Sequence, residues 1–266
     1  MPSTPNDKAQ PGPAALFVSD IHLQPALPRT TEAFFAFLQS RASRAEQLFL
    51  LGDVFEYWAG DDDLVDSFNA MVADRIRAVS DAGVMVYWIA GNRDFLVGPQ
   101  FARAAGLRVL PEPFVLTIGE KRLTLVHGDA QCTDDAGYMA FRAQVRQADW
   151  QRHFLSMPLA QRKAIIADMR SGSQEAQRSK SYEIMDVNPI AIDDLFSSTG
   201  SSIIIHGHTH RPARHEYMDA ADGYHYRLRY VLPDWDCDTE PPRGGWIAVS
   251  ADGMITRHEI GGAGED

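Results

Sequence analysis

The chain has 266 residues, which is enough for one large domain or two small ones. Its formal net charge of −11 argues against general binding of nucleic acid, because phosphate backbones are held by clustered Lys and Arg. A small anionic substrate is still compatible with this charge, since bound divalent metals reverse the local sign of a pocket. The two cysteines form no metal or redox motif and predict reduced thiols in a cytosolic protein.

Residues 1–13 are polar and rich in proline, without the apolar core that a signal peptide contains. We predict that they form a disordered lead-in to the folded chain. No run of the sequence approaches the roughly 18 apolar residues that a membrane span needs. We therefore expect a protein that is soluble or, at most, peripheral to a membrane.

Short runs of β-branched and aromatic residues predict five strands that are buried on both faces. In chain order these runs cover residues 14–18, 47–51, 84–90, 123–126 and 203–205. Apolar residues at helical spacing predict helices at 31–44, 64–82 and 99–105. Thr30 or Thr31 is expected to cap the first helix, and Gly83 to end the second. Strands that alternate with helices indicate a layered α/β core.

The stretch from residue 134 to 195 is polar, prone to form helices and free of strand signals. We interpret residues 138–186, approximately, as an inserted helical cap, and a separate helical domain is the alternative. Strand-like runs return at 224–232, 245–249 and 254–259, with turns at Asp-Gly pairs between them. We expect these runs to complete a second sheet, and this return to strands favours the insertion.

Metal-capable side chains follow all five of the predicted buried strands. In layered α/β folds the loops converge beyond the strand ends, so we expect these side chains to lie together. In extended chain, the two donors of Asp20-x-His22 would point the same way, as would those of His208-x-His210. The candidate metal ligands are Asp20, His22, Asp53, Asn92, His127, His208 and His210.

The donors are carboxylate, amide and imidazole groups without a thiolate, a mixture that suits Mn, Fe or Zn better than Ca or Mg. Seven donors are too many for one tetrahedral site, and they suit two metals about 3.5–4 Å apart that share a carboxylate. Such a pair lowers the pKa of a bridging water and clamps the oxygens of a phosphoryl group. Each piece alone also occurs in ordinary turns, but their combined order predicts a hydrolase of phosphoesters or pyrophosphates.

Four further polar residues lie beside these candidate ligands in the sequence. His206 precedes the Gly207 turn and is expected to support the site rather than to bind metal. Asp94, Asp129 and Thr209 are candidates for orienting the imidazoles, and an ordinary role in a turn is equally open.

The same blocks resemble the calcineurin-like metallophosphoesterases, whose motifs run D-x-H, G-D, G-N-H-D, H-G and G-H-x-H. Here they read Asp20-Ile21-His22, Gly52-Asp53, Gly91-Asn92-Arg93-Asp94, His127-Gly128 and Gly207-His208-Thr209-His210. The resemblance implies a four-layered α/β/β/α sandwich, formed by residues 14–266 with the cap inserted. It also implies two divalent metal ions, with Asp20, His22, Asp53 and His210 around one, and Asp53, Asn92, His127 and His208 around the other.

Arg93 departs from the general family, which has at this position a His that assists the leaving group. Arg stays protonated and does not act as a general acid at pH 7. A pyrophosphate bond has a phosphate leaving group, which needs less protonation than an alkoxide. Arg93 is therefore expected to neutralise charge on two phosphates, and it favours a pyrophosphate substrate.

Longer stretches resemble the UDP-2,3-diacylglucosamine diphosphatases of lipid A synthesis, over nearly the whole chain after residue 13. Examples are Asn92-Arg93-Asp94-Phe95-Leu96 and the run from Ser179 to Asn188. This family implies hydrolysis of UDP-2,3-diacylglucosamine to 2,3-diacylglucosamine 1-phosphate (lipid X) and UMP, by attack of water on the α-phosphorus, usually with Mn²⁺. It also implies a cytoplasmic protein that is peripheral to the inner membrane, with a helical cap over the acyl chains.

The resemblance also places substrate contacts on this chain. Asn92 and Arg93 are expected to be catalytic and to contact the substrate. Ser173, Gln177 and Lys180 fall on the cap segment that contacts substrate, although Gln177 stands where we expect Asn. All of the expected substrate contacts are Asn92, Arg93, Asp135, Tyr138, Ser173, Gln177, Lys180 and His208.

Apolar residues alternate with cations in the cap, between Arg146 and Arg170. This pattern suits a lipid chain at an anionic membrane surface. Taken alone, however, it favours an amphipathic helix pair that packs on the core with its charges in water. Two other functions remain as alternatives. One is a nucleotide or protein phosphatase on the same core, which Arg93 and the apolar cap argue against. The other is a non-catalytic scaffold, which would have lost metal ligands, whereas all seven are present.

Overall fold

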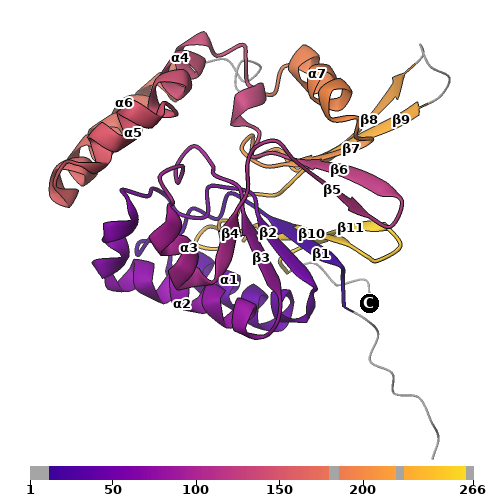
Figure 1. Ribbon diagram of the computed structural model, residues 1–266, viewed down its shortest axis with the longest axis horizontal. Coiled ribbons are helices and arrows are strands. Elements are labelled where there is room, and N and C mark those ends of the chain that lie inside the picture. The colour runs from indigo at the N-terminus through magenta and orange to yellow at the C-terminus, as the bar shows by residue number, and fades with distance from the viewer. Residues whose placement is uncertain (1–11, 180–185, 220–224, 262–266) are drawn as a thin grey trace, which may run out of the picture.

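Two β-sheets are stacked face to face in the computed structural model, which describes residues 12–179, 186–219 and 225–261 (Figure 1). The first sheet has the strand order β11-β10-β1-β2-β3-β4. Its first four strands in the chain are parallel, and β10 and β11 add an antiparallel edge. The strands are β1 (Ala15–Val18), β2 (Gln47–Leu50), β3 (Met85–Trp88), β4 (Leu107–Val109), β10 (Gly245–Val249) and β11 (Ile255–Glu259).

The second sheet has the order β5-β6-β7-β9-β8. Its three central strands β6, β7 and β9 are parallel, and the two edge strands are antiparallel to their neighbours. The strands are β5 (Phe114–Ile118), β6 (Lys121–Leu125), β7 (Ile203–His206), β8 (Ala213–Asp219) and β9 (His225–Val231).

Helices cover the outer face of each sheet (Figure 1). Below the first sheet lie α1 (Pro28–Ser40), α2 (Ser67–Asp81) and α3 (Pro99–Ala105). Above the second sheet lies α7 (Pro189–Thr199). Single 3₁₀ turns are η1 (Ala42–Arg44), η2 (Asp61–Val65) and η3 (Asp129–Gln131).

Successive side chains of a strand point to opposite faces of its sheet, so alternate residues pack in different hydrophobic cores. On β1, Leu16 packs toward α1–α3, whereas Phe17 packs between the sheets. The second sheet contributes Leu125 to the layer between the sheets and Ile204 to the layer under α7. Three separate hydrophobic clusters therefore hold four layers together, and the predicted α/β/β/α sandwich is confirmed.

Two of the predictions about these elements were wrong. Strands β10 and β11 belong to the first sheet, where β10 pairs with β1, and only β9 of the three C-terminal runs extends the second. Helix α1 begins at Pro28, because proline at a first helical position has a suitable φ and needs no amide hydrogen bond. Thr30 is not its cap, since its hydroxyl donates to Asp238 Oδ2 at 2.8 Å.

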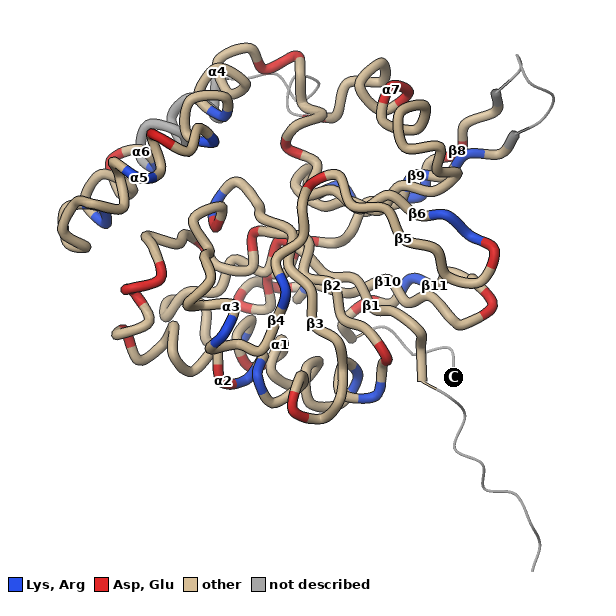
Figure 2. The backbone as a smooth tube through the Cα atoms, in the orientation of Figure 1, with Lys and Arg blue, Asp and Glu red and all other residues tan. Residues whose placement is uncertain are grey.

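Three further helices, α4 (Ala136–Val145), α5 (Ala148–Leu155) and α6 (Leu159–Ser179), lie beside the sandwich (Figure 1). Phe154 of α5 is buried against the core, and the guanidinium of Arg146 lies 5.0 Å from the ring centre of Phe95. Figure 2 shows basic residues along α5 and α6 and acidic residues on the core below. Lys163 Nζ lies 2.6 Å from Asp63 Oδ1 across this boundary.

Arg162 is the most deeply buried of these basic residues, with 1% of its surface exposed. Its guanidinium donates to the carbonyl of Ala59 and to the carboxylate of Asp62. Three helices are thus attached to the core by both apolar and charged contacts. Among the described residues, no helix combines the length and hydropathy of a membrane span.

The Phe101→Ala substitution should destabilise the sandwich by about 3–5 kcal/mol, the usual range for loss of a buried Phe. Phe101 is fully buried, and its ring centre lies 4.9 Å from that of Trp58 and 5.6 Å from that of Trp88. Denaturant unfolding measures the change. Phe141→Ala, at a side chain that is 38% exposed, should change the free energy of unfolding by under about 1 kcal/mol. Equal effects of the two substitutions would contradict this account of the core.

Candidate metal centre

The candidate ligands all follow parallel strands, at the carboxyl ends where the two sheets meet. Asp20 and His22 follow β1, Asp53 follows β2 and Asn92 follows β3. The second sheet contributes one residue after β6 and two after β7, which are His127, His208 and His210. Ligands of layered α/β folds collect beyond the carboxyl ends of the strands, where the loops of several strands meet.

Five of the seven residues have a positive φ, which is uncommon for any residue other than glycine. The φ angles are 54° for Asp20, 54° for His22, 53° for Asp53, 67° for His208 and 54° for His210. The expectation that Asp20-x-His22 and His208-x-His210 are extended was therefore wrong. Left-handed residues turn the chain sharply after β1, β2 and β7, and the donors of Asp20 and His22 still lie in one group with that of His210.

The first group of donors consists of Asp20, His22 and His210, with ligand atoms all within 4.8 Å of one another. The Nε2 atoms of His22 and His210 are 3.3 Å apart, and Asp20 Oδ1 lies 3.5 Å from His210 Nε2. Asp20 Oδ1 is buried and has no hydrogen-bond partner within the described part of the chain. Leaving such an oxygen unsatisfied is costly, so the geometry fits a bound cation.

The outer nitrogens of both imidazoles face carboxylates. Nδ1 of His22 lies 3.1 Å from Glu56 Oε2, and Nδ1 of His210 lies 3.5 Å from Asp234 Oδ2. His22 and Glu56 are at ion-pair distance, although Nδ1 of His22 makes no hydrogen bond among the described residues. A carboxylate that faces Nδ1 favours the proton on that nitrogen, which leaves the lone pair of Nε2 for a metal. Two such lone pairs converging at 3.3 Å repel each other without a cation between them.

The second group contains Asp53, Asn92, His127 and His208, and it adjoins the first through Asp20. Ligand atoms of Asp20, Asp53 and His127 all lie within 4.8 Å of one another. Asn92 Oδ1 is 2.9 Å from His127 Nε2 and 2.8 Å from His208 Nδ1. Nδ1 of His127 donates to the carbonyl of Leu51 at 2.8 Å, so in the neutral ring Nε2 carries the lone pair that a metal would bind.

The pKa values of the two histidines of the second group are shifted in opposite directions. Burial lowers the pKa of His208, as does the neighbouring His127, to about 4. Burial alone would also lower the pKa of His127, but the carboxylates of Asp53 and Asp20 raise it to about 9. The second group thus attracts a positive charge, and divalent metals fit the donor set of both groups.

Two glycines allow the loops to approach the ligands closely. A Cβ atom on Gly91 would lie 2.2 Å from Asp53 Oδ1, and one on Gly207 would lie 2.1 Å from Asp20 Oδ2. These glycines are needed for space, because no side chain fits between the loops. The carboxylates of Asp20 and Asp53 thereby remain in the centre of the cluster.

The Gly91→Ala substitution should reduce kcat/KM about 10²-fold, because displacement of a catalytic group by 1 Å has an effect of this size. The added methyl group has to displace the Asp53 carboxylate or its backbone amide, which would lie 2.3 Å away. Steady-state kinetics with saturating metal measure the loss, and the melting temperature reports on folding. An unchanged kcat/KM would show that the loop can move without cost.

His206 is fully buried and uses both ring nitrogens. Its Nδ1 donates to the carbonyl of Gly207 at 2.9 Å, and its Nε2 accepts from Arg229 at 2.9 Å. Burial and the charge of Arg229 lower its pKa to about 3, so the ring is neutral. This arrangement leaves no nitrogen for a metal and agrees with the expected supporting role.

The three residues considered for orienting the imidazoles, Asp94, Asp129 and Thr209, make hydrogen bonds to other groups. Asp94 accepts hydrogen bonds from the backbone amides of Val54 and Gly91 and so joins two loops. Asp129 accepts from Tyr138 and Arg142 of α4. The backbone amide of Thr209 donates to Gly207 within the turn. Of the two roles left open for them, Asp94 and Thr209 have the role in a turn.

Sequence reasoning missed two carboxylates, Glu56 and Asp234, which face the imidazoles of the candidate ligands His22 and His210. Glu56 lies three residues after Asp53, in the run Val54-Phe55-Glu56-Tyr57-Trp58, and an acid among aromatic residues is the signal that could have identified it. Burial would raise the pKa of Glu56, but His22, Arg93 and Arg170 lower it, so the carboxylate is charged at neutral pH. Asp234 has no comparable signal.

Several expected substrate contacts lie beside the metal centre. Arg93 follows Asn92, donates its backbone amide to Asp53 Oδ1 at 2.8 Å and keeps a quarter of its side chain exposed. Tyr138 stacks near His208 with ring centres 6.1 Å apart. Asp135 caps α4 by accepting from the amide of Tyr138. Ser173 and Gln177 lie on α6 in a part whose side chains are outside the description, and Lys180 lies outside the described residues.

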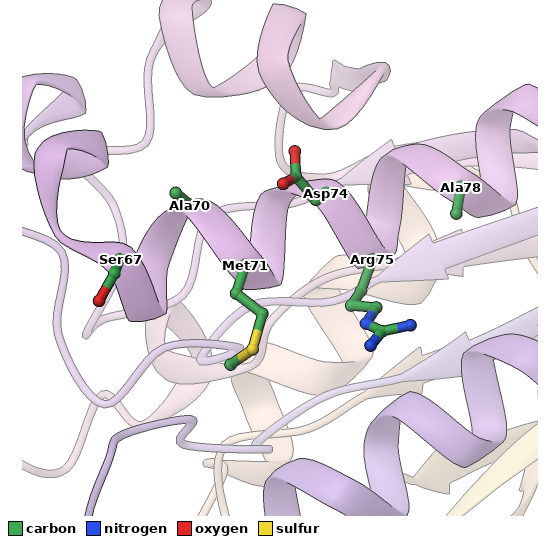
Figure 3. A pocket seen from close by; sticks show the side chains of 6 residues that line it. All are labelled: Ser67, Ala70, Met71, Asp74, Arg75 and Ala78. Carbon is green, nitrogen blue, oxygen red and sulfur yellow. The ribbon is translucent and has the colours of Figure 1, made fainter.

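An open hollow on the surface lies elsewhere, along α2. Figure 3 shows its lining, and none of the candidate ligands belongs to it. The lining residues are Ser67, Ala70, Met71, Asp74, Arg75 and Ala78. Because all six come from one helix on the outer layer, the hollow is separate from the strand ends that form the centre.

Comparison with known proteins agrees with this geometry. The family of calcineurin-like phosphoesterases matches residues 14–212. A UDP-2,3-diacylglucosamine hydrolase of Bordetella parapertussis is 46% identical, over 94% of this chain and 96% of its own. Proteins of the same name from Aromatoleum aromaticum and Escherichia coli O81 are 47% and 44% identical. They match 85% and 92% of this chain, and 90% and 98% of their own lengths.

Proposed function

Because the chain belongs to the calcineurin-like phosphoesterases, we propose that it is a metal-dependent hydrolase of UDP-2,3-diacylglucosamine in lipid A biosynthesis. Three relatives that align along most of its length carry that name. The products are 2,3-diacylglucosamine 1-phosphate (lipid X) and UMP, formed when water attacks the α-phosphorus. The observation that carries this proposal is the convergence of all seven donors, since loss of a ligand would indicate a non-catalytic scaffold.

We assign the donors to two divalent ions, for which Mn²⁺ is our proposal. Asp20, His22, Asp53 and His210 hold one ion, and Asp53, Asn92, His127 and His208 hold the other. Ligand atoms of Asp20, His22 and His210 lie together, as do those of Asp20, Asp53 and His127, which supports two adjoining ions. When bound, such a pair supplies the activated water and neutralises charge on the phosphoryl oxygens.

Arg93 and Asn92 bind the diphosphate beside the ions. Arg93 donates its backbone amide to Asp53 and keeps a quarter of its side chain exposed, which supports this role. A guanidinium stays charged at neutral pH and donates two parallel hydrogen bonds to phosphate. It therefore stabilises the phosphate that leaves, without the proton that an alkoxide leaving group would need.

We propose the helices α4–α6 as a cap over the acyl chains, at about residues 138–186. Asp135, Tyr138 and His208 bind the polar part of the substrate, and Ser173, Gln177 and Lys180 bind it from the cap. Exposed apolar side chains on the cap include Phe141, Leu155 and Met169. They support docking of the cap on the cytoplasmic face of the inner membrane, where apolar residues next to cations bind anionic lipid.

A comparison of substrates tests the proposal. The full chain with Mn²⁺ is expected to release UMP from UDP-2,3-diacylglucosamine, and to act far more slowly on p-nitrophenyl phosphate and on dinucleotide polyphosphates. A preference for p-nitrophenyl phosphate would indicate a general phosphatase instead. Turnover that continues in excess chelator would exclude the metal-dependent reaction, whatever the substrate.

A further inference from the structure

One carboxylate, that of Glu56, contacts three functional parts of the molecule. Its Oε2 lies 3.1 Å from Nδ1 of His22, in the first group of metal donors. Its Oε1 lies 3.7 Å from Nη1 of Arg93 and accepts a hydrogen bond from Nη2 of Arg170, on α6. Only 12% of the Glu56 side chain is exposed, so water competes little for these contacts.

The backbone fixes the position of Glu56. The loops after β1 and β2 continue side by side beyond the sheet, with the amide of Leu23 bonded to the carbonyl of Val54 and that of Glu56 bonded to the carbonyl of Leu23. An isolated β-bridge joins Leu23 to Phe55 in the same stretch. The carboxylate is therefore held over His22 by main-chain pairing, which a change of its side chain leaves in place.

The charges around Glu56 do not balance. One carboxylate faces two guanidinium groups, Arg93 and Arg170, so a net positive charge lies at the edge of the metal centre. Nε of Arg170 is buried and, among the described residues, has no hydrogen-bond partner. Its guanidinium also lies 5.7 Å from the ring centre of Tyr57, which limits its freedom to move. The positive charge of the two guanidinium groups at this edge complements the second phosphate of a diphosphate.

We propose that Glu56 is a positioning residue, which orients His22 toward its metal and holds Arg93 and Arg170 on either side of the diphosphate. It does not contact the reacting atoms. A carboxylate behind a metal-binding imidazole fixes the ring and increases its basicity. Because the same carboxylate also accepts from α6, the metal centre and the helices above it are joined through one side chain. This inference rests on the proposed ligation by His22 and on the diphosphate class of the substrate, but not on the lipid.

Metal binding and helix protection test the two functions of Glu56 separately. Mn²⁺ is titrated calorimetrically into the chelator-treated full chain, and hydrogen exchange is followed in α6. Glu56→Gln, which keeps the shape and removes the charge, should weaken binding of one Mn²⁺ by about 10–100-fold and speed exchange in α6. Glu120→Gln, at an exposed position in the turn between β5 and β6, is the matched control. It should equal the parent both in Mn²⁺ binding and in the rate of hydrogen exchange in α6.

Arg170→Ala separates the two functions, because it removes only the link to α6. It should speed exchange in α6 and raise KM, while Mn²⁺ binding stays within about twofold of the parent. If Glu56→Gln fails to fold, Glu56→Asp provides the same test, since its shorter carboxylate keeps the charge and loses the reach.

Two outcomes would overturn the inference. One is unchanged Mn²⁺ binding in Glu56→Gln, even with a lowered melting temperature, which would make the role purely structural. The other is that Arg170→Ala weakens Mn²⁺ binding as much as Glu56→Gln does, which would mean that loss of the helix contact alone disturbs metal binding. A parent chain that binds no Mn²⁺ would overturn the metal centre itself. A parent that binds Mn²⁺ but leaves UDP-2,3-diacylglucosamine intact would overturn the proposed substrate, and weakened binding in Glu56→Gln would still support the inference.

Discussion

The Asp53→Asn variant is expected to lose about 10³-fold or more of kcat, while the chain remains folded. Asp53 is 2% exposed, and its carboxylate lies within 4.8 Å of the ligand atoms of Asp20 and His127, which we assign to different ions. Asparagine keeps the shape, still accepts from the amide of Arg93 and tolerates the φ of 53° at this position. Only the negative charge is lost, so a fall in activity reports on the metals.

Thermal unfolding with and without Mn²⁺ identifies the cause of this loss. Metal that binds only the folded chain at 100 times its Kd adds about 2.7 kcal/mol per site to the stability. The parent should therefore melt at a higher temperature with Mn²⁺ than with a chelator, and Asp53→Asn should show a smaller difference. Asp74→Asn, on the exposed face of α2, is the control and should behave as the parent. Full activity of Asp53→Asn would refute the assignment of Asp53 to both ions.

The Arg93→Ala variant is expected to lose about 10³-fold of kcat on UDP-2,3-diacylglucosamine, a loss typical of an arginine that stabilises phosphoryl transfer. Arg93 has no proton to give at neutral pH, so its contribution is charge and hydrogen bonding to the phosphates. Since that contribution grows as charge develops on the leaving phosphate, kcat should fall more than KM rises.

Arg93→Lys tests whether geometry matters as well as charge. Lysine restores a positive charge without the two parallel donors, so a partial recovery of kcat is expected. Arg108→Ala, at an exposed position on β4, should leave kcat unchanged. Mn²⁺ binding by Arg93→Ala should equal that of the parent, because its side chain is not a ligand. Undiminished turnover by Arg93→Ala would remove this residue from the mechanism.

The sequence predicted the layers and the cluster of donors because both depend on local patterns. Buried parallel strands are short and nearly all-apolar, and helix α3 was predicted at its observed bounds, from Pro99 to Ala105. Each donor follows such a strand directly, so the fold alone brings the seven together. The spacing of Asp20 and His22 also predicted that their two side chains lie together, although their backbone is left-handed and not extended.

What the sequence could not predict depends on contacts between distant segments. Strand β10 pairs with β1, more than 200 residues earlier, and nothing in the run Gly245–Val249 distinguishes one sheet from the other. Glu56 and Asp234 are single acids in loops, and only the folded chain places them behind His22 and His210. The three expected contacts Ser173, Gln177 and Lys180 remain predictions.

The five left-handed residues of the metal centre also bear on how the protein acquires its ions. Each costs about 1–2 kcal/mol relative to an ordinary conformation, and the contacts of the sandwich must supply that energy. The ligands are thus arranged by folding itself, unlike those of small zinc modules, whose binding free energy is their folding free energy. One ion can therefore be exchanged for another without unfolding. Which ion occupies the centre in the cell is then decided by competition, according to the relative affinities and free concentrations of the available metals.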